Sequence, residues 1–232
     1  MKIAVISDIH GNVYALMKVL EDIENQDVDT IICLGDLVGY GPHPNEVVAT
    51  IRRRKILCIK GNYDASVVDN AFSFIRDTSI NSFSLPWTVD ELRVSNKYFL
   101  SSLPSNITLN FEGKSLSFVH GSPRAINEYM KDDETLLTEI MNEFNGDILV
   151  CAHTHLPFIK KFGNKLLIND GSVGKPKIGR PNCTYAIIEL YEGTSPKAEI
   201  REIEYDYHKT IKDMEMNKFP SMLISSYKSG IE

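Results

Sequence analysis

Hydrophobic and polar residues follow two different rhythms in the first third of the chain. Three short apolar runs, KIAVIS, DTIICLG and KILCIKG, are typical of buried strands. Between them, NVYALMKVLEDIEN and PNEVVATIRRR repeat apolar positions at helical spacing. The residues expected on one buried face of the first helix are Val13, Leu16, Met17 and Leu20. Strands that alternate with helices of this length predict βαβ units and a parallel sheet.

The pattern changes from residue 64 to about residue 104, where it becomes irregular and helical. We expect this stretch to be a helical insertion over one end of the sheet. Within it, Thr88 and Glu91 have the spacing of a capping box, which predicts a helix start at Thr88.

Strand-like runs dominate the rest of the chain. NITLNFEG and KSLSFVHG predict a hairpin, followed by a helix over about 133–144 and the strand DILVCA. PFIKKFG, KLLIND, CTYAIIELYEG and PKAEIREIEYD predict a second, more antiparallel sheet packed against the first. From about 207 to 232 we expect one helix and a polar tail.

Composition is that of an ordinary globular protein, and we expect a single α/β domain over residues 1–232. The chain has 43% hydrophobic and 24% charged residues and a formal net charge of −6, so neither stable nucleic-acid binding nor membrane binding is expected. The four cysteines lie in or beside apolar runs without a CxxC, as expected of buried thiols in a reducing compartment. With no signal peptide or membrane span expected, the predicted location is the cytoplasm.

Polar side chains follow five of the predicted strands, at the point where each strand ends. In an open α/β sheet, these ends line one crevice. The residues in question are Asp8, His10, Asp36, Asn62, His120, His153 and His155. Taken singly, each of them could also cap a helix or satisfy a loop.

This donor set indicates a hydrolytic metal site. Imidazole, carboxylate and amide ligands without a thiolate suit manganese, iron, nickel or zinc, and we expect manganese first. Seven ligands are too many for one ion with an open position. They predict two divalent metal ions that share a bridging carboxylate, about 3.5–4 Å apart.

The order of these motifs resembles that of the calcineurin-like metallophosphoesterase superfamily. Its motifs D-x-H, G-D, G-N-H-D/E, H and G-H-x-H correspond here to DIH, GD, GNYD, VHG and AHTH. The strings GDLVGYGPHPNEV, HGSPR and NDGSVGKPK resemble the small bacterial and archaeal phosphodiesterase branch. The resemblance implies a four-layer α/β/β/α sandwich.

The same resemblance implies a role for each matching residue. Asp8, His10 and His155 would hold the first ion, and Asn62, His120 and His153 the second. Asp36 would bridge the two ions. A hydroxide bound by both would attack phosphorus in line. The resemblance thus implies a hydrolase of phosphoester bonds, and we expect a phosphodiesterase. The candidate catalytic residues are Asp36, Asn62, Tyr63, Asp64 and His120.

The chain departs from the family pattern at Ala152, which replaces a glycine, and at Tyr63, which replaces a histidine. The family's histidine is thought to act near the leaving oxygen, held by the acid that follows it, here Asp64. A phenol with a pKa near 10 is a poorer acid than an imidazole near 6.5. We therefore expect substrates whose leaving group needs no proton. Alternatively, Tyr63 donates a hydrogen bond to a phosphoryl oxygen or only packs over the site.

Two further residues are candidates for substrate binding. Arg124 could clamp a substrate phosphate or form a surface salt bridge. Asn12 could contact the substrate or cap the first helix.

Other functions stay open at this point. The expected substrate is a small phosphodiester or a nucleotide-type molecule; a dinucleoside polyphosphate hydrolase and a phosphoprotein phosphatase are the enzymatic alternatives. A catalytically inactive scaffold with the same fold is a third reading, and the β-rich last third could support a homo-oligomer.

Overall fold

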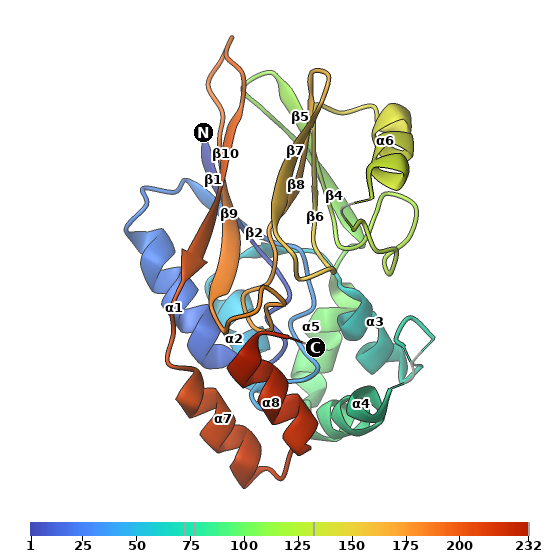
Figure 1. Ribbon diagram of the computed structural model, residues 1–232, viewed down its shortest axis with the longest axis vertical. Coiled ribbons are helices and arrows are strands. Elements are labelled where there is room, and N and C mark those ends of the chain that lie inside the picture. Colours follow the sequence, from blue (N-terminus) through green and yellow to red (C-terminus); the bar gives the residue numbers. More distant parts are fainter. Residues whose placement is uncertain (72, 77, 132, 232) are drawn as a thin grey trace.

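The computed structural model, which describes residues 1–71, 73–76, 78–131 and 133–231, contains two five-stranded sheets packed face to face (Figure 1). The first sheet has the order β10-β9-β1-β2-β3, formed by β1 (Lys2–Ile6), β2 (Thr30–Cys33), β3 (Leu57–Cys58), β9 (Cys183–Glu189) and β10 (Lys197–Ile203). The second has the order β4-β5-β6-β8-β7, formed by β4 (Asn106–Phe111), β5 (Lys114–Val119), β6 (Ile148–Cys151), β7 (Phe158–Phe162) and β8 (Lys165–Asn169).

Helices cover the outer face of each sheet. The flanking helices are α1 (Val13–Glu24) and α2 (Pro44–Arg53) on the first sheet and α6 (Glu134–Glu143) on the second. Along β1, Ile3 and Val5 point into the core between the sheets, while Ala4 and Ile6 pack toward the helices. This period of two is the ordinary strand alternation. The predicted four-layer α/β/β/α sandwich is confirmed.

Five more helices gather at the end of the sandwich drawn at the bottom of Figure 1. They are α3 (Asn62–Asp69), α4 (Ser79–Glu91), α5 (Val94–Ser102), α7 (Tyr207–Met216) and α8 (Ser221–Ser229). Trp87 and Phe83 of α4 pack against Phe219 between α7 and α8. The helical stretch after residue 62 and the C-terminal helices thus meet at the same end of the sheets.

Two helix predictions were wrong. Met17 is 46% exposed, and α1 instead buries Ala15, Val19 and Ile23, which lie on the same 3.6-residue face as Leu16 and Leu20.

Thr88 does not start a helix, because it lies inside α4, where its hydroxyl donates a hydrogen bond to the carbonyl of Ser84 at 2.7 Å. The helix ends at Leu92 and Arg93, whose extended backbone separates α4 from α5.

The strands of the last third divide between the two sheets. β7 and β8 join the second sheet, whereas β9 and β10 extend the first: β9 pairs antiparallel with β1, and β10 pairs antiparallel with β9. An apolar run predicts a strand but not its partner, because pairing depends on residues far away in the chain. The expected polar tail contains α8, which buries Leu223 and Tyr227. None of the described helices is long and apolar enough to cross a membrane.

Candidate metal centre

The loops after β1, β2 and β3 meet the loops after β5 and β6 at one end of the two sheets. Backbone bonds join the first two loops: the N–H groups of Asp8 and His10 donate to the carbonyls of Gly35 and Asp36 at 3.0 and 2.9 Å. The loop after β3 then approaches so closely that a Cβ on Gly61 would lie 2.1 Å from Asp36 Oδ1. Position 61 therefore has no room for a side chain, and only glycine fits there.

Five of the seven predicted ligands have a left-handed backbone. Their φ angles are 48° for Asp8, 47° for His10, 52° for Asp36, 67° for His153 and 60° for His155. A non-glycine residue in this region costs about 1–3 kcal/mol and is concentrated at functional sites. The fold therefore holds these side chains in a shared pocket against their local backbone preference.

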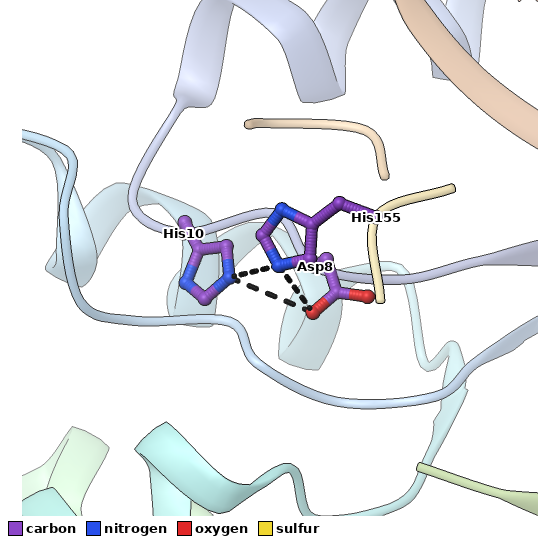
Figure 2. Close-up of side chains that lie close together, drawn as sticks. All are labelled: Asp8, His10 and His155. Atoms are coloured by element: carbon purple, nitrogen blue, oxygen red, sulfur yellow. Dashed lines mark hydrogen bonds and ion pairs between the residues drawn. The ribbon is translucent and has the colours of Figure 1, made fainter. Parts of the chain in front are cut away.

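The first ligand group consists of Asp8, His10 and His155, all buried (Figure 2). Both imidazole Nε2 atoms face Asp8 Oδ1, at 3.5 Å for His10 and 3.3 Å for His155, and they lie 3.2 Å from each other. Each ring donates its Nδ1–H to a backbone carbonyl, that of Val38 or Lys175. The Nε2 lone pairs are thereby directed at one point, as in metal-bound histidines.

The second group consists of Asp36, His120 and His153, with Asn62 beside them. His120 Nε2 lies 2.9 Å from Asn62 Oδ1 and 3.4 Å from Asp36 Oδ2, and its Nδ1–H donates to the carbonyl of Leu34 at 2.8 Å. The amide nitrogen of Asn62 donates to the carbonyl of Phe74, which turns the amide oxygen toward His120.

Asp36 lies between the two groups. Its Oδ2 is 3.4 Å from His120 Nε2 and 3.7 Å from His10 Nε2, while its Oδ1 accepts the backbone N–H of Tyr63 at 2.8 Å. The structure thus brings together all seven residues that follow the predicted strands.

Three buried atoms at the centre of this cluster lack a hydrogen-bond partner in the described part of the chain. They are Asp8 Oδ1, Asp36 Oδ2 and His153 Nε2. Buried polar atoms are almost always paired, because an unpaired one loses its hydration without compensation. Acceptor atoms that converge in this way fit divalent cations, and the residues present could hold them.

The charges of the cluster agree with this fit. Burial opposes ionisation of Asp8, but the neighbouring His155 and His10 hold its pKa well below the usual range. Burial lowers the pKa of His153 to about 3 and that of His155 to about 4, so both imidazoles are neutral, as coordination requires. Against the effect of burial, the carboxylate of Asp36 raises the pKa of His120 to about 10. His120 then carries a proton that a bound cation would replace.

Tyr63 lies over this centre but is turned away from it. The residue is 5% exposed, its ring packs edge-on against His10, and its hydroxyl donates to Asn81 Oδ1 at 2.8 Å and contacts the hydroxyl of Tyr40. Burial and Tyr40 raise the pKa of Tyr63 well above its ordinary value.

The Asp64 carboxylate is engaged by backbone groups rather than by the Tyr63 hydroxyl, which donates to Asn81. Its carboxylate accepts the backbone N–H groups of Leu37 and Gly61 at 2.9 and 3.0 Å, and so ties together the loops that carry Asp36 and Asn62. Burial and the charge of Asp36 raise the pKa of Asp64 to about 7.

The two other substrate-binding candidates, Asn12 and Arg124, both have partners within the chain, and Arg124 lines a cavity together with His120. Asn12 is buried and caps α1: its Oδ1 accepts the backbone N–H of Ala15, and its amide nitrogen donates to the carbonyl of Gly174. The guanidinium of Arg124 forms ion pairs with Glu128 and Glu139.

Sequence reasoning missed the residues that support the cluster from outside. Asp170 is fully buried and accepts the Ser7 hydroxyl at 2.8 Å, and that hydroxyl also lies 3.0 Å from Asp8 Oδ2. Tyr40 packs on His10, and the ammonium of the buried Lys175 lies 4.8 Å from the Tyr40 ring centroid. The position of Asp170 directly after β8 was the available signal, because β8 runs parallel to β6.

Comparison with known proteins agrees with this geometry. The model of the calcineurin-like phosphoesterase superfamily domain matches residues 1–193, and the chain belongs to this family of phosphoester hydrolases.

Three similar proteins illustrate the relationship. An uncharacterised protein of Methanocaldococcus jannaschii, MJ0912, is 37% identical over 238 residues, with 95% of each chain covered. The phosphodiesterase YfcE of Escherichia coli is 26% identical over 199 residues, 82% of this chain and 88% of the relative. The crystal structure of a metallophosphoesterase from Sphaerobacter thermophilus is similar with a TM-score of 0.84 and 28% identity, covering 100% of this chain and 99% of that one.

Proposed function

We propose that the chain is a metal-dependent phosphodiesterase with a centre for two divalent ions. Asp8, His10 and His155 would hold one ion, and Asn62, His120 and His153 would hold the other. Asp36 lies where it would contribute to both. The observation that carries this proposal is that buried ligand atoms of the described residues gather in two adjacent groups, with an unpaired atom in each.

Two bound divalent ions supply positive charge for the phosphoryl oxygens and lower the pKa of a water that attacks phosphorus. The chain's own residues orient this chemistry. Backbone carbonyls fix the tautomers of His10, His120 and His155. Asp64 holds the two loops of the second group together. The donor set lacks a thiolate, which favours manganese, with iron, nickel and zinc as alternatives.

Tyr63 supports the choice of a diester with an acidic leaving group. Its hydroxyl donates to Asn81, and its raised pKa makes the phenol a poor proton donor at neutral pH. The aryl oxide of an aryl ester and the phosphate of a phosphoanhydride can leave as anions, without a proton. The serine alkoxide of a phosphoprotein is more basic and needs one. The proposed substrate is therefore a small phosphodiester or nucleotide-type molecule.

Hydrolysis assays on chelator-treated protein test this proposal. Manganese is added back, and the substrates are bis(p-nitrophenyl) phosphate and the matching monoester. We expect turnover that depends on the metal and is faster for the diester. Absence of turnover with every divalent metal tried, or turnover that survives chelation, would overturn the proposal.

A further inference from the structure

A cavity of about 330 Å³ opens beside the candidate metal centre. It shares a wall with the centre, because Asn62 and Tyr63 line both. Phe74, Ile75 and Met222 give the cavity an apolar side. Its volume lies at the lower end of the range of small-molecule pockets, about 300–1,000 Å³.

Tyr129 connects the cavity with the second ligand group. Its ring centroid lies 4.0 Å from that of His153, and Tyr129 also lines the cavity. The segment that carries Arg76 is fixed to the same group, because Asn62 donates a hydrogen bond to the carbonyl of Phe74. A group bound against Tyr129 would therefore lie next to the proposed second ion.

Two cations lie near the Tyr129 ring, Arg76 from a distant part of the sequence and Lys131 from two residues further along the chain. The guanidinium carbon of Arg76 is 4.6 Å from the ring centroid and the ammonium of Lys131 is 5.6 Å from it. Within the described part of the chain, neither has an ion-pair partner, whereas Arg124, Arg180 and Arg201 all do. Because no carboxylate of the described residues pairs with either cation, a bound anion would offset their positive charge.

We propose that Arg76, Lys131 and Tyr129 form a subsite for a second phosphate, next to the phosphate that is cleaved. The substrate is then a nucleoside polyphosphate ester, whose aromatic base fits the apolar side of the cavity. This inference rests on the proposed function, which places the scissile phosphate at the metal centre.

The subsite also gives a reason for the tyrosine at position 63. Hydrolysis of a phosphoanhydride forms a bond between the water oxygen and phosphorus and breaks the bridging P–O bond. The leaving phosphate takes the electron pair and departs as an anion, and the protons of the water pass to solvent. Arg76 and Lys131 stabilise that anion, so that no acid is needed at Tyr63.

Kinetics on three substrates test the subsite in manganese-loaded protein. Diadenosine tetraphosphate has bases and further phosphates, thymidine 5′-monophosphate p-nitrophenyl ester has a base and one phosphate, and bis(p-nitrophenyl) phosphate has neither. For Arg76→Ala and for Lys131→Ala, we expect kcat/KM on the tetraphosphate to fall about tenfold relative to that on the other two. Arg76→Lys, which keeps the charge, should recover much of the loss.

The matched control is Arg52→Ala, which removes an exposed arginine at the end of α2 and leaves the ratios as in the wild type. Equal losses on all three substrates would assign Arg76 and Lys131 a structural role and overturn the subsite. Unchanged ratios would overturn it too.

Calorimetric binding of inorganic pyrophosphate separates the two proposals. We expect Arg76→Ala to weaken pyrophosphate binding about tenfold. If the wild type cleaves the diester but the variant binds pyrophosphate equally well, the subsite is wrong and the phosphodiesterase stands. If nothing is cleaved but pyrophosphate binding depends on Arg76, the subsite stands and the proposed reaction is wrong.

Discussion

Asp36 is the carboxylate that lies between the two ligand groups. Its Oδ2 faces His10 and His120 and has no hydrogen-bond partner in the described residues. We expect Asp36→Asn to lower metal affinity by more than about 100-fold, because changes outside the ligand shell already cost about 10–100-fold. Titration of chelator-treated protein with manganese measures this.

Glu143→Gln is the control for the lost charge. Glu143 is an exposed carboxylate on α6, and its replacement should leave metal affinity unchanged. Asp36→Asn protein that binds two manganese ions as tightly as the wild type would contradict the role of Asp36.

We expect the residue at position 63 to control protonation of the leaving group. Tyr63→His places an imidazole, with an ordinary pKa near 6.5, beside the metal centre. We expect diesters with alkyl leaving groups to gain up to about 100-fold in rate, while aryl diesters change little. The measurement is the slope of log kcat/KM against leaving-group pKa, which should become shallower.

Tyr63→Phe separates acid catalysis from packing, because it removes the hydroxyl and keeps the ring. For Tyr63→Phe, the slope of log kcat/KM against leaving-group pKa should stay as steep as in the wild type. The same slope in the histidine variant would show that position 63 does not control protonation of the leaving group.

At the scale of the elements, the loop that leads into α3 is fixed by its close approach to the loop after β2. A Cβ at Gly61 would lie 2.2 Å from the backbone nitrogen of Asp36 as well as 2.1 Å from its Oδ1. We expect Gly61→Ala to destabilise the fold by about 1–3 kcal/mol, as overpacking does, and to weaken metal binding. Denaturant unfolding in chelator and manganese titration measure the two effects.

Gly113→Ala is the matched control, in the turn between β4 and β5. Gly113 has a φ of 73° and open space around it, so an alanine there costs about 1–2 kcal/mol of backbone strain only. Its metal affinity should equal that of the wild type. A Gly61→Ala protein with normal metal affinity would mean that the two loops can separate without disturbing the ligands.

Most elements could be predicted from the sequence, because their signals are local. The strands β1, β2 and β3, the helices α1, α2 and α6 and the hairpin of β4 and β5 appeared where the apolar pattern placed them. Thr88 was misjudged, because a capping-box spacing and the interior of a helix look alike until the preceding turn at Ser84 is known. α8 was missed, because a short helix is stabilised mainly by what it packs against.

At the scale of the whole molecule, the candidate centre joins the two sheets. Asp8, Asp36 and Asn62 follow strands of the first sheet, whereas His120 and His153 follow strands of the second. A bound metal would therefore stabilise the packing of the sheets as well as the loops. At a free metal concentration of 100 times Kd, linkage gives about 2.7 kcal/mol. We expect Tm to rise by about 5–10 °C on loading, measured by calorimetry with and without chelator.

Asp36→Asn protein at the same metal concentration is the control and should lose most of this increase. A wild-type Tm that does not change while two ions bind would mean that the ligands are equally available in the unfolded chain.

The sequence by itself determined the layered α/β class and the seven residues that follow the strands, because strand periodicity and strand ends are local properties of the chain. Only the tertiary structure decided which strands pair and that Asp64 binds backbone rather than Tyr63. It also decided that Arg124 faces Glu128, while Arg76 and Lys131 face Tyr129. Side chains with several possible partners are assigned by contacts between residues far apart in sequence, and no local pattern records those contacts.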